Sequence, residues 1–210
     1  MNLKNKRVLI TAGPTWVPID SVRVISNIAT GQSGILLAQK LAGLGAKVTL
    51  LLGPVGACRL NRKIRVITYQ FFDELKGRLS KEIRSKKYDI VVHSAAVSDY
   101  QPVRAYRGKI SSGLKLLRIN LRPTVKLINL IKKADRSLFL VGFKFEPRAG
   151  EKNILPAARR LLALAGLDLV VANTARQEQY QAYILNRERA YGPYRSKPAM
   201  VNRLAGLMGG

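Results

Sequence analysis

Short apolar runs alternate along this chain with longer segments in which apolar residues recur at helical spacing. An apolar run bounded by turn residues predicts a strand that is covered on both faces of a parallel sheet. Apolar residues three and four positions apart predict a helix with one face against that sheet. Strands are expected at 7–11, 48–52, 63–69, 88–92, 137–143, 167–172 and 182–185. Helices are expected at about 30–44, 72–83, 124–134, 155–164 and 198–207.

This alternation predicts a single domain over residues 1–210, of the α/β class. It indicates a doubly wound, Rossmann-like and mostly parallel sheet. Ligands of such sheets bind at the carboxyl ends of the strands. We therefore expect the site where residues 11–13, 93–99, 143–144 and Asn173 meet.

Two segments interrupt the alternation. A long loop separates the first strand from the first helix, and it contains Trp16 and several branched apolar residues. A long loop inside a compact domain is usually functional or disordered, and this composition argues against disorder. The second segment, Gln101–Gly113, is polar, basic and glycine-containing, and the apolar run 114–120 after it predicts a further strand.

Composition limits the class of protein. Apolar residues make up 47% of the 210 residues, which is enough for a sizeable core. No apolar run is long enough to span a membrane, so no membrane partner is expected. The single Cys58 cannot form an intrachain disulfide, which favours a cytoplasmic protein. One Cys and one His also disfavour a zinc site or a Cys–His nucleophile.

The net charge of +25 allows two interpretations. A polyanion such as nucleic acid would be attracted to such a surface. However, Lys and Arg are spread from Lys4 to Arg203 without a long run, an aromatic ladder or a nucleic-acid-binding motif. This spacing favours an ordinary solvated surface and makes a nucleic-acid partner the less favoured hypothesis.

Three common α/β activities are disfavoured, because the chain lacks their motifs. The chain has neither a G-x-x-x-x-G-K-[ST] phosphate loop nor a G-x-S-x-G nucleophile elbow. The second strand ends in Leu51-Leu-Gly-Pro54, without the acidic residue that holds the ribose of NAD. What remains is a helix start at Thr30-Gly31, the amide Asn27, the acid Asp99 and Lys109. A helix start binds anions through unpaired amides, so this inventory suits phosphoryl or nucleotidyl chemistry.

These residues belong to a series of motifs that resembles one family, phosphopantothenate–cysteine ligase. This family is also called phosphopantothenoylcysteine synthetase, and it forms the synthetase domain of the coenzyme A biosynthesis flavoprotein. The matching stretches are Ile10-Thr-Ala-Gly-Pro-Thr15, Pro18-Ile-Asp-Ser-Val-Arg-Val-Ile-Ser-Asn27, Thr30-Gly31-x-x-Gly34, Gly45-Ala-x-Val-Thr-Leu-x-x-Gly-Pro54, Ala95-Ala-Val-Ser-Asp-Tyr100, Gly108-Lys-Ile110, Val141-Gly-Phe143 and Val171-Ala-Asn173. They occur in the family's order from Arg7 to Asn173 and so cover most of the chain.

The resemblance implies a ligase that joins 4'-phosphopantothenate to L-cysteine through an acyl-nucleotide. The nucleotide is expected to be CTP, as in most bacterial members, with ATP as the alternative and Mg²⁺ as the accompanying ion. The family also implies a homodimer, in which the insert Gln101–Leu117 crosses between subunits. A separate flavin-dependent decarboxylase is a further expected partner.

The resemblance also assigns residues. Asn27 and Lys109 are expected to be catalytic, Asn27 by holding the acyl-nucleotide and Lys109 as a cation on the phosphates. No protein side chain is assigned to a metal. The residues expected to bind the nucleotide are Gly13, Thr30, Gly31, Gly34, His93, Ser94, Ala95, Asp99, Arg122, Pro123, Thr124, Val125 and Phe143.

The chain departs from the family pattern in three stretches. Gln32 stands where the family has a lysine, and Arg122-Pro-Thr124 replaces asparagine-proline-aspartate. Leu161 and Ala165 occupy two further lysine positions, with Arg159 and Arg160 close by. These changes motivate an alternative, a nucleotide-binding relative without ligase activity. At single residues, a turn-capping Asn27, a solvated Lys109 and a structural His93 also stay open.

Overall fold

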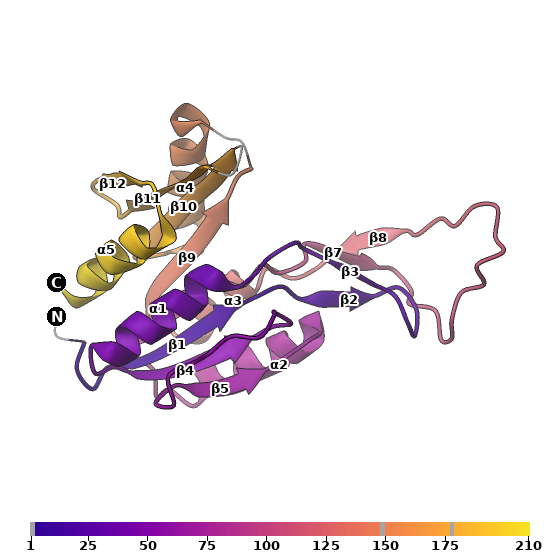
Figure 1. Cartoon of the computed structure of the whole chain (residues 1–210), viewed down its shortest axis with the longest axis horizontal. Helices are drawn as coiled ribbons and strands as arrows, with labels where there is room; N and C mark the ends of the chain where they lie inside the picture. The colour runs from indigo at the N-terminus through magenta and orange to yellow at the C-terminus, as the bar shows by residue number, and fades with distance from the viewer. Residues whose placement is uncertain (1–2, 148–149, 177–178) are drawn as a thin grey trace.

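A computed structural model of the chain describes residues 3–147, 150–176 and 179–210. Its centre is an eight-stranded sheet in the order β12-β11-β10-β9-β6-β1-β4-β5 (Figure 1). Within this sheet, β10, β9, β6, β1, β4 and β5 run parallel to one another. β11 and β12 continue the sheet antiparallel. The predicted doubly wound and mostly parallel sheet is confirmed.

Apart from β12, which was not predicted, the elements of the sheet and its helices occur in the predicted order. The strands of the sheet are β1 Arg7–Ala12, β4 Lys47–Leu52, β5 Arg65–Thr68, β6 Ile90–His93, β9 Phe139–Phe145, β10 Leu169–Arg176, β11 Gln179–Leu185 and β12 Ala190–Tyr194. The helices are α1 Gln32–Gly43, α2 Phe72–Arg84, α3 Leu127–Ala134, α4 Glu151–Ala165 and α5 Lys197–Gly209.

Two apolar cores lie on the two faces of the sheet, because successive side chains of a strand point to opposite faces. Val8 and Ile10 of β1 pack with α1 and α5. Leu9, between them, packs with α2, α3 and α4 on the other face. The central strands are therefore buried on both sides, which explains why their sequences read as unbroken apolar runs.

An arm projects from the carboxyl end of the sheet (Figure 1). It consists of the hairpin of β2 (Trp16–Pro18) and β3 (Val24–Ser26) and of the segment from β7 (Tyr100–Pro102) to β8 (Leu121–Pro123). The hairpin occupies most of what the sequence predicted as a long loop after the first strand.

The strand predicted at 114–120 is wrong. The chain has no regular structure there and pairs only afterwards, where β8 lies against β7. Leu114, Leu116 and Leu117 are exposed. An apolar run forms a strand only where a neighbouring strand completes its hydrogen bonds, and this run has no such neighbour.

Two helix starts also differ from the prediction. The helix expected from 124 begins at Leu127, because Thr124 is held by the segment after β6: its N–H donates to the Asp99 carbonyl at 2.9 Å. The helix expected from 155 begins at Glu151, whose carboxylate suits the positive end of the helix dipole. Among the described residues, no helix has the length and apolar content of a membrane span.

Candidate functional site

The start of α1 lies over the carboxyl end of β1. Gly31 is the N-cap, in the left-handed conformation at φ 68°, and the helix proper begins at Gln32. The first-turn amides have no partner within the helix, and the first turn carries no acidic residue. The helix was expected from about Thr30 and begins two residues later. Its start is suited to an anion, and anion binding there stays a prediction.

Glycines allow this helix start to approach the strands closely. A Cβ on Gly34 would lie 2.6 Å from both the Ala12 Cβ and the Ser94 Oγ. A Cβ on Gly31 would lie 3.0 Å from the backbone nitrogen of Gly13, which itself has a positive φ of 85°. The structure thus brings Gly13, Gly31, Gly34 and Ser94 together, four of the residues predicted to bind nucleotide.

His93, at the end of β6, is buried beside the same strand end. Its Nδ1 lies 2.9 Å from the Thr11 Oγ1, and the Ala95 N–H donates to that same oxygen at 3.2 Å. Ser94 donates its hydroxyl to the Thr11 carbonyl at 2.7 Å. Burial lowers the pKa of His93 to about 4, so the ring is neutral at pH 7. Thr11 organises this group, and sequence reasoning had placed it at the site without giving it a role.

Asn27 lies at the edge of this group. Its Nδ2 donates to the carbonyls of Ala96 (3.2 Å) and Val97 (3.0 Å), so the amide joins the end of the β2–β3 hairpin to the segment after β6. The side chain remains exposed. The geometry gives Asn27 a structural contact and an open side, and its catalytic role stays a prediction.

A cavity of about 160 Å³ opens next to His93. Six predicted nucleotide-binding residues line it: His93, Ala95, Asp99, Thr124, Val125 and Phe143. Leu161, one of the departures from the family pattern, lines it as well. Arg122 and Pro123 lie in β8 at the base of the arm, exposed and outside the lining.

Two contacts at this cavity were not foreseen. Lys126 pairs with Asp99 at 2.6 Å, and both side chains are exposed. Thr124 donates its hydroxyl to the Ser98 carbonyl at 2.7 Å. No sequence pattern indicated either contact, because each depends on how the segment after β8 folds back onto the segment after β6.

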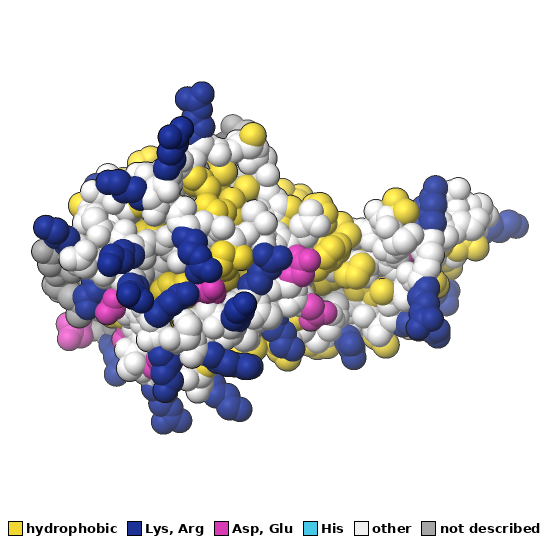
Figure 2. All heavy atoms as spheres, turned by 90° about the horizontal axis from the view of Figure 1, so that it is seen from below, with side chains coloured by type: hydrophobic (Ala, Val, Ile, Leu, Met, Phe, Trp, Pro, Cys, Tyr) yellow, Lys and Arg dark blue, Asp and Glu magenta, His cyan; other side chains and the backbone are white. Residues whose placement is uncertain are grey.

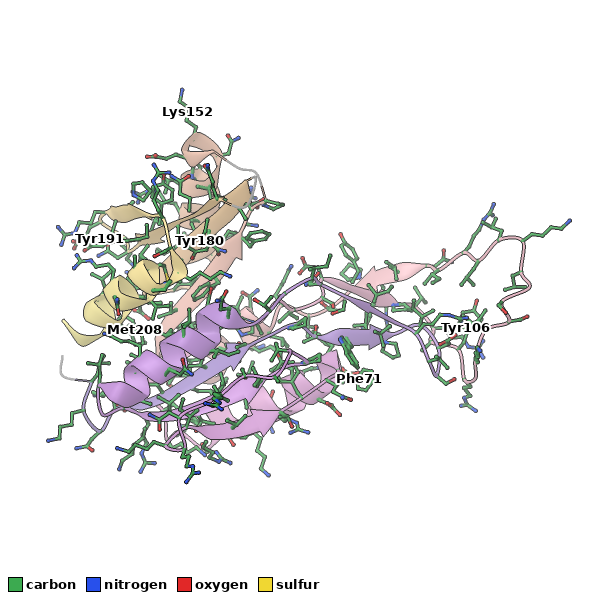
Figure 3. All side chains as sticks on the ribbon, in the orientation of Figure 1. Phe71, Tyr106, Lys152, Tyr180, Tyr191 and Met208 are labelled. Atoms are coloured by element: carbon green, nitrogen blue, oxygen red, sulfur yellow. The ribbon has the colours of Figure 1, made fainter. Side chains whose placement is uncertain are left out.

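Lys109 is not brought together with the other predicted site residues. The residues on either side of it are tied to the turn of the β2–β3 hairpin: the Ile110 N–H donates to Asp20 at 3.0 Å, and the Ser21 N–H donates to the Gly108 carbonyl at 3.4 Å. Figure 3 places nearby Tyr106 towards the far end of the arm. Lys109 itself is exposed.

Asp20 holds this end of the arm together. Its buried carboxylate accepts from the backbone N–H groups of Ile110, Val22 and Arg23, and it pairs with the Arg23 guanidinium at 2.5 Å. The hydrogen bond from Ile110 first, and then those from Val22 and Arg23, hold the pKa of Asp20 far below its usual range despite burial. The backbone beside Lys109 is therefore held by a charged carboxylate.

A second hollow, of about 460 Å³, lies at the amino ends of β1, β4 and β5. Arg7, Lys47, Lys63, Arg65 and Lys87 all line it. Burial alone would raise the pKa of Glu82, but hydrogen bonds from Lys87, Tyr88 and Arg65 lower it to about 2. Two of the five cations are thus already paired with Glu82.

On the face seen in Figure 2, Lys and Arg side chains are spread over both the body and the arm. Within the described residues, no three His, Cys, Asp or Glu side chains come together in a way that could hold a metal. Asp99, the acid nearest the cavity, is occupied by Lys126. The described side chains at this site do not fit a protein-held Mg²⁺.

Comparison with known proteins relates this site to one family. The model of the DNA/pantothenate metabolism flavoprotein C-terminal domain matches residues 3–192. The chain is 36% identical over 208 residues to the coenzyme A biosynthesis bifunctional protein CoaBC of Thermococcus kodakarensis, covering 97% of this chain and 51% of that protein. It is 33% identical over 171 residues to CoaBC of Bacillus subtilis, covering 81% and 41%. The chain therefore spans about half the length of these curated relatives.

Solved structures share the fold. The DNA/pantothenate metabolism flavoprotein of Streptococcus pneumoniae superposes with a TM-score of 0.87 at 24% identity, over 97% of this chain and 98% of that one. A Cab2 mutant in complex with phosphopantothenate-cysteine superposes with a TM-score of 0.75 at 17% identity, over 98% and 87%. The resemblance to the phosphopantothenoylcysteine synthetase domain is confirmed by the family match and the relatives.

The close approach at Gly34 generates a prediction. Gly34→Ala should destabilise the protein by about 1–3 kcal/mol, because the Ala12 Cβ cannot move out of the way. Gly43→Ala in the same helix is the control, since a Cβ there meets nothing within 4 Å and should stabilise by up to about 1 kcal/mol. Urea unfolding of both variants measures the difference. Equal stability of the two variants would show that α1 does not press on β1.

Proposed function

The chain belongs to the DNA/pantothenate metabolism flavoprotein C-terminal domain family, and from this we propose that it is a phosphopantothenate–cysteine ligase of coenzyme A biosynthesis. It joins 4'-phosphopantothenate to L-cysteine, with CTP as the nucleotide and ATP as the alternative. The observation that carries the proposal is the acid-free start of α1, which Gly34 allows to lie directly against the ends of β1 and β6. The enzyme works in the cytoplasm.

The reaction has two steps. The pantothenate carboxylate attacks the α-phosphate of the nucleotide and displaces pyrophosphate. The amine of cysteine then attacks the acyl carbon of the acyl-nucleotide, and the nucleoside monophosphate leaves. Both steps require stabilisation of phosphate charge and positioning more than a covalent nucleophile on the protein.

Each group of residues at the site has a separate role in this reaction. The amides of the first turn of α1 bind phosphate oxygens, and the helix dipole adds partial positive charge there. His93 contributes no charge, because burial keeps its pKa near 4 and its ring neutral at pH 7. Asn27, exposed at the edge of the group, holds the acyl-nucleotide. The cavity beside Phe143 has room for one ring system and takes the base.

Lys109 acts in the site of a second copy of the chain. It is the cation that the mechanism needs, yet the residues on either side of it are bonded to the turn of the β2–β3 hairpin in the arm. The arm also exposes apolar side chains that a second copy would cover, namely Val103, Tyr106, Leu114, Leu116, Leu117 and Leu121. A homodimer in which Gln101–Leu117 crosses the interface brings Lys109 to the partner and removes that surface from water.

The curated relatives are bifunctional proteins about twice as long as this chain. We infer that a flavin-dependent decarboxylase, fused or separate, takes the product of this reaction. The alternative function is a nucleotide-binding relative without ligase activity. Leu161 favours it, because it places an apolar side chain in the cavity where the family pattern has a lysine.

The first test of the ligase is single turnover without cysteine. With phosphopantothenate and CTP, the protein should form a phosphopantothenoyl-cytidylate and release pyrophosphate, which mass spectrometry and a phosphate assay measure. ATP in place of CTP determines the choice of base. Binding of CTP without any acyl-nucleotide would support the inactive relative, and an acyl-phosphate with CDP would contradict the mechanism.

The second test asks whether Lys109 serves the partner's site. Lys109→Ala and Asn27→Ala should each lower kcat by on the order of a hundredfold or more. If the two residues meet across the interface, co-refolding both variants creates one intact site per mixed dimer and restores about a quarter of wild-type activity. Lys115→Ala, in the same exposed loop, is the control and should remain active. If mixing restores no activity, Lys109 and Asn27 do not meet across the interface, and the proposed placement of Lys109 in the partner's site is wrong.

A further inference from the structure

The start of α5 lies beside the start of α1, although the two helices are far apart in the sequence. Lys197 is the first residue of α5, and its Nζ donates to the Gln32 Oε1 at 2.7 Å. Gln32 is the first residue of α1. The packing of α5 against α1 through the shared core fixes this contact, because Leu37, Leu41, Met200 and Leu204 belong to one cluster.

A hollow of about 560 Å³ opens at this contact. Among the residues that the structure describes, its lining contains two cations, Arg195 and Lys197, and no carboxylate. Tyr180 also lines it, with the Lys197 Nζ 5.9 Å from its ring centroid. The Tyr180 hydroxyl is buried and has no hydrogen-bond partner among the described residues. The remaining lining residues are Gln32, Gln179, Ser196 and Pro198.

Lys197 occupies an electrostatically unfavourable position. A helix start carries partial positive charge, which disfavours a cation there. Lys197 lies at the start of its own helix and reaches the start of a second one. Its partner at Gln32 is a neutral amide oxygen, and no ion pair of Lys197 is found within the described part of the chain. An anion between the two helix starts would relieve this repulsion and accept from amides at the start of α1.

We propose that Lys197, supported by Arg195, binds a phosphoryl group at the start of α1. The inference rests on the proposed function and assigns this group to the triphosphate of the nucleotide, because the first turn of α1 forms one wall. The family pattern has a lysine at position 32, where this chain has Gln32. Here a cation reaches the same helix start from α5, close to the other end of the chain.

The experiment measures the KM of each phosphate-bearing substrate separately. Lys197→Ala should raise the KM for CTP by about tenfold or more, since a charge-assisted hydrogen bond to phosphate is lost. The KM for phosphopantothenate should stay within about twofold. Gln32→Lys in the Lys197→Ala background should recover most of the loss by returning a cation from α1. Lys152→Ala is the control, because Lys152 lies in the first turn of α4 and is exposed.

Two results would overturn the proposal. An unchanged KM for CTP would make Lys197 a surface cation, and a raised KM for phosphopantothenate alone would assign it to the other phosphate. Calorimetric titration with CTP alone, without turnover, separates this failure from failure of the proposed function. If the wild type makes no product but binds CTP more tightly than Lys197→Ala, the ligase proposal fails and the phosphate site stands. Equal affinity of the two proteins removes the phosphate site.

Discussion

The structure depends on how closely the start of α1 approaches the end of β1. Gly34 leaves no room for a Cβ between the helix and Ala12, and Gly31 and Gly13 supply the two left-handed turns that the approach requires. Because the amides of a helix start act only at short range, this approach places them where the carboxyl ends of β1 and β6 meet. The buried and neutral His93 completes that surface without adding charge.

The arm imposes the opposite constraint, since it keeps one predicted catalytic residue away from that surface. Asp20 fixes the turn of the β2–β3 hairpin to Ile110, so the arm holds Lys109 outward as a defined structure. Asn27, at the base of the same hairpin, is bonded to the segment after β6. In the proposed homodimer, one hairpin would therefore link the site of its own subunit to a cation in the site of the other. This separation, together with the exposed leucines of the arm, is the physical argument for that proposal.

The sequence predicted best what local patterns determine. Apolar runs identified the central strands, because strands buried on both faces have no polar alternation to obscure them. The run 114–120 failed because pairing depends on a partner strand, which a local pattern does not report. At the site, motif order located Gly31 and Gly34, whereas the contact between Lys197 and Gln32 arises only when α5 packs on α1. The outward position of Lys109 likewise depends on tertiary structure.

The central claim is that the nucleotide binds at the carboxyl end of the sheet, at the start of α1. Amide chemical shifts recorded during a titration with CTP test it most directly, because different residues form the carboxyl end of the sheet and the hollow at its amino end. The account predicts the largest changes at residues 31–35 and at Ser94 and Ala95. Changes centred instead on Lys47, Arg65 and Lys87, which line the hollow at the amino ends of the strands, would contradict it.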